Sequence, residues 1–237
     1  MRTIKHVHLT CLPVILAIMV LLFSHMVNAT PSGLNNIPTA DVAPTGVLVM
    51  QQFSNFGSDQ QSLYHLGFKY GLAENWEVGL DKRIHESGSG SGVSGAGGMP
   101  AGPWVFQAKY RYDLPGGNSS LGLGLANVGE DSDKAGDSYP YAVLSHNLRS
   151  FRGHLGYGGK DAARGIFLGV DKTLRGGAVL RADWLQTNDR DESLASIGFL
   201  KPLSGPWVIE GWVSFPTAAG VEDTFTLKFD YVFDFKR

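Results

Sequence analysis

Among its 237 residues the chain has a single cysteine, Cys11. This cysteine precedes an apolar run at residues 12–23, so we expect it to leave with a cleaved N-terminal segment. The rest of the chain then has no thiol for disulfides, cysteine metal sites or a cysteine nucleophile. The net charge is also small. Its formal value of −2 indicates no excess of basic residues for binding nucleic acid, so we predict no nucleic-acid partner.

Long apolar runs are absent after residue 29, so the sequence predicts no membrane-spanning helix there. The early run at residues 12–23 is too short to span a bilayer comfortably and is followed by small residues at a typical cleavage position. We therefore predict a secretory signal peptide at residues 1–29 and a mature chain that begins at Thr30.

The sequence is rich in alternation of apolar and polar residues. Residues 225–235 carry four phenylalanines and one tyrosine at alternate positions, which is typical of a strand with one apolar and one polar face. Because no helical pattern accompanies such strands, nothing in the chain can cover the apolar face. We expect that face to contact lipid.

Alternating segments bounded by turn residues recur about twelve times along the chain. We place them at residues 45–54, 62–72, 75–84, 103–114, 119–128, 139–148, 151–158, 165–174, 177–186, 193–202, 206–215 and 223–235. The connections alternate between tight turns and longer loops, the longest of them at residues 87–102 and 129–138. The glycine-rich part of the first loop lacks the Lys-Ser or Lys-Thr of a phosphate-binding loop.

An even strand number and alternating loop lengths are typical of bacterial outer-membrane barrels. We predict an all-β fold: a closed antiparallel transmembrane β-barrel of about 12 strands over residues 44–237. Its location would be the outer membrane of a Gram-negative bacterium, in contact with outer-membrane lipid, with long loops outside. The short turns and both termini would lie in the periplasm.

Polar residues share one parity along these strands, which predicts that they face the barrel interior. The predicted pore-lining residues are Lys69, Glu77, Asp81, Arg83, Gln107, Lys109, Arg111, Asp113, Asp171, Arg181, Asp183, Glu210, Trp212, Lys228 and Asp230. Their mixed charges permit two interpretations. They can pair in a closed, salt-bridged interior, or form opposed walls along a narrow aqueous path.

Residues 30–43 precede the first strand, and their prolines favour an extended backbone. This extension can fold into the lumen as a plug, or lie as a tail under the barrel.

Catalysis finds little support in the sequence. Ser145, His146 and Asn147 are consecutive, so on a strand their side chains alternate between faces and cannot converge as a hydrolase site. A short turn could bring His154 near His146, without a nucleophile. The spacing of the histidines matches no metal site, and we predict neither metal nor cofactor.

The segment Gly33-Leu34-Asn35-Asn36-Ile37-Pro38-Thr39-Ala40 resembles the start of uncharacterised outer-membrane barrels and of the larger Yjb-type exopolysaccharide-associated barrel proteins. The resemblance implies an envelope role, with polysaccharide secretion as one option. It also implies recognition by the barrel assembly machinery through a terminal aromatic residue. Here Phe235 is followed by two basic residues instead of ending the chain.

Together these features predict a narrow passive pore for small polar solutes, and no enzyme. The first alternative is a non-conducting envelope component linked to exopolysaccharide export or surface interaction. The second is an outer-membrane lipid hydrolase.

Overall fold

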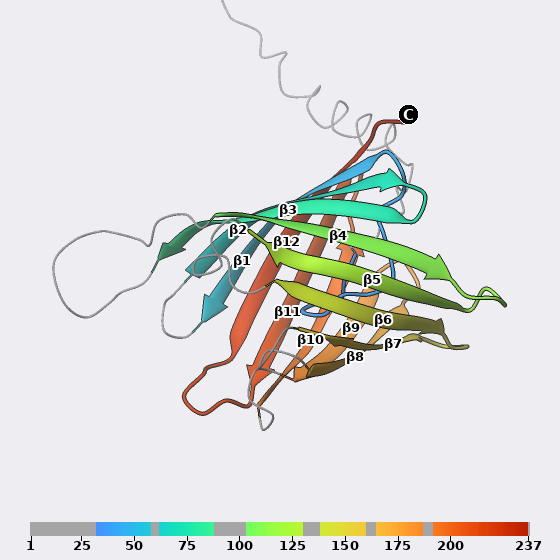
Figure 1. Ribbon diagram of the computed structural model, residues 1–237. Coiled ribbons are helices and arrows are strands. Elements are labelled where there is room, and N and C mark those ends of the chain that lie inside the picture. The colour runs from blue at the N-terminus through green and yellow to red at the C-terminus, as the bar shows by residue number, and fades with distance from the viewer. Residues whose placement is uncertain are drawn as a thin grey trace, which may run out of the picture.

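The computed structural model describes residues 32–57, 62–87, 103–129, 138–159, 165–186 and 192–236. These residues form twelve antiparallel strands that close into one barrel, each strand pairing with its sequence neighbours and β1 with β12 (Figure 1). The strands are β1 (Val47–Gly57), β2 (Ser62–Ala73), β3 (Trp76–Ser87), β4 (Trp104–Asp113), β5 (Ser119–Val128), β6 (Tyr139–Asn147), β7 (Arg152–Gly158), β8 (Gly165–Thr173), β9 (Val179–Gln186), β10 (Ser193–Pro202), β11 (Trp207–Pro216) and β12 (Thr224–Asp234).

The predicted fold class is confirmed, including the alternation of connection lengths. Connections after even-numbered strands have two to five residues, and those after odd-numbered strands have six to sixteen, except the four-residue connection between β1 and β2. We call the two rims the short-turn end and the long-loop end. β1 begins and β12 ends at the short-turn end. The predicted signal peptide and the two longest predicted loops lie outside the described residues.

The predicted strand limits agree to within a few residues, and β1 departs most. It runs to Gly57 instead of residue 54, because Asn55 and Phe56 pair with Thr226 and Phe225 on β12. Ser, Asn and Gly at this end have the composition of a turn, but closure of the barrel supplies hydrogen-bond partners for them. Long-range pairing therefore overrides the local turn preference.

The outer face of the barrel is apolar. On β8, Ile166, Leu168 and Val170 point outward and are exposed, and the outward residues of the other strands repeat this pattern. Aromatic pairs lie at the short-turn end, where Trp76 packs against Tyr110 with ring centroids 4.9 Å apart. An apolar band bordered by aromatic side chains is typical of a barrel wall in lipid. Among the described residues, no helix is long and apolar enough to cross a membrane.

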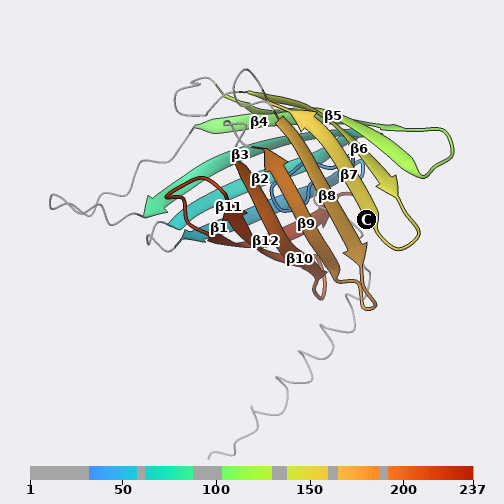
Figure 2. The same ribbon diagram turned by 90° about the horizontal axis from the view of Figure 1, so that it is seen from below.

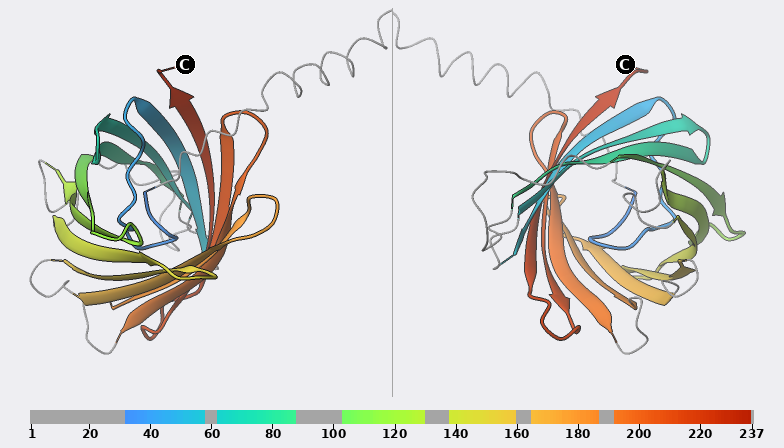
Figure 3. Two further views of the ribbon diagram at one scale, coloured as in Figure 1. Left: turned by 90° about the vertical axis from the view of Figure 1, so that its right-hand side faces the viewer. Right: turned by 60° about the vertical axis from the view of Figure 1, so that its left-hand side comes forward.

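Residues 32–43 fold into the barrel interior as a hairpin, which we call the N-terminal hairpin. Gly33 pairs with Pro38 in an isolated bridge, and the Leu34 amide donates to the Ile37 carbonyl at 2.9 Å. A view close to the barrel axis shows this segment, in blue, inside the ring of tilted strands (Figure 3), and a view across the strands shows it among them (Figure 2). Residues 32–43 of the predicted extension therefore lie in the lumen and not under the barrel.

Glycines on the inner wall make room for this segment. A side chain at Gly71 on β2 would place its Cβ 2.0 Å from the Pro44 carbonyl oxygen, where the chain enters the barrel. A Cβ at Gly122 on β5 would lie 2.9 Å from the Ala40 Cα. At Gly71 the distance is far below any ordinary contact, so a larger residue there would displace the chain where it enters the barrel, whereas at Gly122 a side chain would require a small shift of the hairpin away from β5.

Two apolar clusters fill other parts of the interior. One lies at the short-turn end and joins Val47, Val49, Leu200, Val208 and Val232. In the other, Leu34, Ile37 and Ala40 of the hairpin pack against Val143 of β6 and Phe167 of β8. The first cluster therefore fills the lumen beside β1 and β10 to β12, and the second packs the hairpin against β6 and β8.

Candidate functional site: the lumen and the N-terminal hairpin

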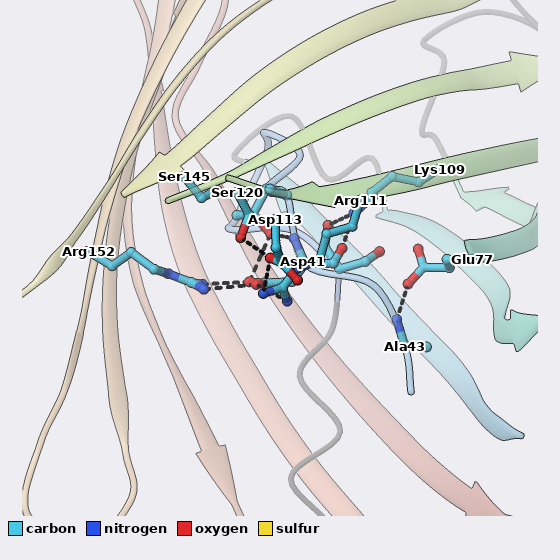
Figure 4. A network of polar contacts seen from close by, with 12 residues as sticks. Asp41, Ala43, Glu77, Lys109, Arg111, Asp113, Ser120, Ser145 and Arg152 are labelled. Atoms are coloured by element: carbon cyan, nitrogen blue, oxygen red, sulfur yellow. Dashed lines mark hydrogen bonds and ion pairs between the residues drawn. The ribbon is translucent and has the colours of Figure 1, made fainter. Parts of the chain in front are cut away.

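Asp41 forms the main ionic attachment of the N-terminal hairpin. Its carboxylate accepts two hydrogen bonds from the Arg152 guanidinium on β7, at 2.8 and 2.5 Å (Figure 4). Asp171 on β8 holds the same guanidinium from the far side at 3.0 Å, and Arg111 lies 3.9 Å from Asp41. A bidentate pair fixes both the distance and the direction of the two groups, so Asp41 locks the hairpin against β7.

Backbone groups of the hairpin are also hydrogen-bonded to side chains of the wall. The Ala43 amide donates to the Glu77 carboxylate at 2.7 Å, and the Ala40 amide donates to the Ser145 hydroxyl at 3.0 Å (Figure 4). On the same side the Lys109 ammonium donates to the Asp41 carbonyl at 2.7 Å. These contacts satisfy backbone groups that would otherwise be buried without partners.

At its tip, the hairpin reaches the opposite wall. The amides of Asn35 and Asn36 donate to one Asp183 carboxylate oxygen on β9, at 2.9 and 3.1 Å. The Asn36 side chain also donates to Ser196 on β10 and to Ser214 on β11. The hairpin therefore spans the bore, from β3 and β4 on one side to β9, β10 and β11 on the other.

The hairpin separates two cavities. The cavity at the long-loop end measures about 490 Å³ and has residues 32–38 in its wall. The cavity at the short-turn end measures about 510 Å³ and includes Asp41, Arg152 and Asp171. Gly33 and Leu34 line both cavities, so this part of the hairpin lies between them.

One wall of the bore is locked by ion pairs. The Glu210 carboxylate is buried between Arg181, with which it forms an ion pair, and Lys228, which lies at 2.9 Å. Asp230 lies 3.6 Å from the same Lys228 ammonium and is fully buried. Charges in so dry a place are compensated by one another, so this wall has the salt-bridged character of the first interpretation.

The predicted pore-lining residues are divided among these environments. Lys69, Asp81, Gln107, Lys109, Trp212 and Lys228 line the cavity at the long-loop end, whereas Asp171 and Arg181 line that at the short-turn end. Glu77 and Asp183 are buried against the hairpin, and Arg111 pairs with Asp113 near the short-turn end. The side chain of Arg83 lies outside the described part of the chain.

Sequence reasoning missed Asp41 and Arg152 as functional residues. A usable signal existed for the first, because Asp41 is the only charged residue between positions 30 and 43. For Arg152 there was none, since its importance depends on where the hairpin ends in space.

Ser145 was set aside as a nucleophile with no histidine, and this expectation was wrong in one respect. His154 does not approach His146; its Nδ1 lies 2.8 Å from the Ser145 hydroxyl, and its Nε2 lies 2.9 Å from Asp171. His146 points to the outer face and contacts Ser119 instead, at 2.7 Å. As expected, Ser145, His146 and Asn147 do not converge.

The chain of hydrogen bonds through Ser145, His154 and Asp171 has the composition of a hydrolase triad but supports the hairpin here. Ser145 is 5% exposed, and its hydroxyl accepts the Ala40 amide, so the docked hairpin covers this hydroxyl. It also faces the lumen and not the lipid. Within the described ranges no cluster of His, Asp and Glu has the arrangement of a metal site.

Acid should weaken the attachment of the hairpin. Burial would raise the pKa of Asp41, but the hydrogen bonds and charge of Arg152, with the charge of Lys109, outweigh it and hold the pKa below its usual range. A group with a lowered pKa stabilises the docked state at pH above its free value, about 4, and loses this contribution as pH falls through the docked value. We therefore expect the hairpin to leave its docked position more often below about pH 4. In bilayer recordings the fraction of time for which the bore conducts should then rise, and this rise should be smaller in Asp41→Asn.

In overall structure the barrel is similar to known outer-membrane channels. A KdgM porin superposes with a TM-score of 0.56 and 12% identity, over 79% of this chain and 99% of that chain. A second structure of the KdgM porin, in complex with disordered oligogalacturonate, gives a TM-score of 0.55 over the same shares of both chains. An outer membrane channel from Pseudomonas putida F1 gives 0.58 at 15% identity, over 82% of this chain and 98% of that chain.

At these identities the likeness establishes the fold alone: a closed antiparallel β-barrel of the kind that these channels have. No protein-family model matches the chain, and no curated protein matches it in sequence. The functional argument therefore depends on the lumen.

Proposed function

We propose that the protein is an outer-membrane channel for small polar solutes, held closed by its N-terminal hairpin. The observation that carries this proposal is the pair of cavities, one at each end of the bore, with part of the hairpin between them. Movement of that part would join them. The proposal that polar solutes pass is also supported by the similar fold of the KdgM porin, one structure of which is in complex with oligogalacturonate.

The attachments of the hairpin suit a reversible closure. Its main contacts to the wall are hydrogen bonds and one bidentate ion pair, and water can replace each of these when the hairpin leaves. The apolar contacts of Leu34 and Ile37 are the part that must be exposed on opening. A device with this balance can be displaced without unfolding the barrel.

The opened path would run along the wall formed by β2 to β8, because the opposite wall is filled by the apolar cluster and the buried ion pairs. Lys69, Lys109, Arg111 and Arg152 would line it, together with Glu77 and Asp171. β1 begins and β12 ends at the short-turn end. The usual arrangement of such barrels would place this end, where the chain enters the lumen, on the periplasmic side. Closure would then be controlled from the periplasm.

Reversal of charge at Lys109 and Arg111 tests whether this wall lines the conducting path. In a protein shortened to start at Pro44, Lys109 loses its hairpin partners and faces water. The change to Glu at both positions should shift the reversal potential in a salt gradient toward cation selectivity. Lys201, which donates to the Gly176 carbonyl in a turn, provides the matched control, and Lys201→Glu should leave selectivity unchanged. Equal selectivity of all three proteins would contradict the proposed path.

The closed lumen also favours one alternative: a non-conducting envelope component, linked to exopolysaccharide export as the Yjb-type resemblance implies. For that role the shortened protein would remain silent in a bilayer although folded. Deletion of the gene would instead alter the secreted polysaccharide.

A further inference from the structure

The cavity at the long-loop end has the features of a binding site and not only of a passage. It is enclosed below by the hairpin and bordered by strand ends at the long-loop rim, where Asn55, Ala126, Tyr139 and Thr224 line it. Its volume of about 490 Å³ falls within the usual range of small-molecule pockets, about 300–1,000 Å³. A solute that enters from the long-loop side must stop here while the hairpin is docked.

Uncharged hydrogen-bonding groups dominate the wall of this cavity. They include Asn35, Gln51, Asn55, Gln107, Tyr139 and Tyr141. Amides and hydroxyls offer both donors and acceptors, and they are closely spaced. A ligand that matches such a wall must also carry several groups that donate and accept.

The charged groups of the wall are already paired. Asp81 accepts a hydrogen bond from Gln107, Lys109 donates to hairpin carbonyls, and Lys228 pairs with Glu210. Lys69 donates to the Ser32 hydroxyl at 3.4 Å and lies in the field of Asp81. The cavity therefore does not call for a charged ligand.

Three side chains of the wall, Asn35, Gln51 and Trp212, have buried polar atoms without hydrogen-bond partners among the described residues. The Trp212 indole N–H is buried with no acceptor, in a side chain that is 8% exposed. The Asn35 amide has neither an acceptor for its nitrogen nor a donor for its oxygen. Buried groups of this kind are costly when unpaired, and a hydroxyl can satisfy both needs because it donates and accepts.

Aromatic rings complete the wall. Tyr139 and Tyr141 lie beside each other with centroids 6.0 Å apart, and Phe53 and Trp212 also line the cavity. Ring faces of this size pack well against the C–H face of another ring. Together with the hydroxyl-binding groups they favour a cyclic polyol.

We propose that this cavity binds a neutral monosaccharide or disaccharide before it passes the hairpin. Only the second part of this proposal, the later passage of the sugar through the barrel, rests on the proposed channel function. Binding itself requires the closed barrel as it stands, so the two proposals can fail separately.

Calorimetric titration of the refolded chain, from Thr30, with D-glucose, sucrose and D-glucuronate tests the assignment. At least one neutral sugar should bind, and glucuronate should bind no more tightly than glucose. Trp212→Phe keeps a smaller aromatic ring but removes the N–H donor, and should weaken binding about tenfold, the size of one lost hydrogen bond. Trp184→Phe, on the outer face of β9, is the matched control and should bind like the parent. Tyr139→Leu, at the rim, provides a second variant if Trp212→Phe does not fold.

Failure of both neutral sugars to bind at concentrations up to 100 mM, or binding that neither Trp212→Phe nor Tyr139→Leu changes, would overturn the proposal. Tighter binding of glucuronate by tenfold or more would overturn it in favour of an anion site. Sugar binding in a protein that never conducts would sustain this site while removing the channel function. Conduction without sugar binding would sustain the channel function and remove this site.

Discussion

A protein shortened to begin at Pro44 should conduct ions in a planar bilayer, whereas the form beginning at Thr30 should stay closed for most of the record. The shortened form lacks the hairpin that lies between the two cavities, and its strands remain complete because β1 starts at Val47. Steady single-channel steps from the shortened form are the expected result. A synthetic peptide with residues 30–43, added from the short-turn side, should reduce these steps in proportion to its concentration.

Silence of the shortened form would contradict the proposed function, provided that its folding is verified by circular dichroism and by heat-dependent migration in gels. Equal currents from the two forms would contradict it in another way, since the hairpin would then not obstruct the bore.

Replacement of Asp41 by Asn should open the full-length channel without shortening it. The change removes the charge that accepts two hydrogen bonds from Arg152 and leaves that guanidinium to Asp171 alone. A charge-assisted attachment of this kind contributes about 2 kcal/mol, so the ratio of open to closed channels should rise about 30-fold. Single-channel recording at pH 7 measures the ratio directly.

Asp223→Asn is the matched control, because Asp223 is exposed on the connection before β12 and the change in net charge is the same. An open fraction that rises equally in both variants would attribute the effect to net charge and not to the attachment. No rise in Asp41→Asn would show that the other contacts hold the hairpin by themselves.

The barrel could be predicted from the sequence because its signal is local. Alternation along Phe225, Leu227, Phe229, Tyr231 and Phe233 marks a strand with a lipid-facing side, whatever the rest of the chain does. The same parity places charged residues such as Lys109 and Glu210 inside. Turn residues then fix strand number and connection lengths, which together determine closure.

The lumen could not be predicted in the same way, because its contacts depend on register and stagger. The pair of Asp41 and Arg152 joins residues 111 positions apart. The hydrogen bonds through Ser145, His154 and Asp171 require three strands to meet at one level. A one-residue slip of any of these strands would turn its side chain to the lipid.

Inward apolar residues were the least visible feature. Val232 interrupts the polar face of the last strand, and from the sequence it is only an exception to the alternation. In the barrel it meets Val47, Val49, Leu200 and Val208, so that four strands close one side of the bore. The order of the strands in the barrel decides whether such inward apolar residues lie apart or form one cluster.

A reversible covalent lock would test most directly that the docked hairpin closes the channel. Cysteines at positions 40 and 122 suit a disulfide, since a Cβ at Gly122 would lie 3.4 Å from the Ala40 Cβ, and a small shift of the hairpin away from β5 brings this distance to the usual separation of about 3.8 Å. Cys11 is the only natural cysteine, and it lies in the predicted signal peptide.

The decisive recording uses Ala40→Cys and Gly122→Cys together with Asp41→Asn, so that the hairpin is free to leave unless it is tied. We predict single-channel currents under reducing conditions, their disappearance on oxidation and their return on reduction within the same bilayer. Currents that persist unchanged after oxidation, in protein shown to be cross-linked, would contradict the claim that the docked hairpin closes the bore.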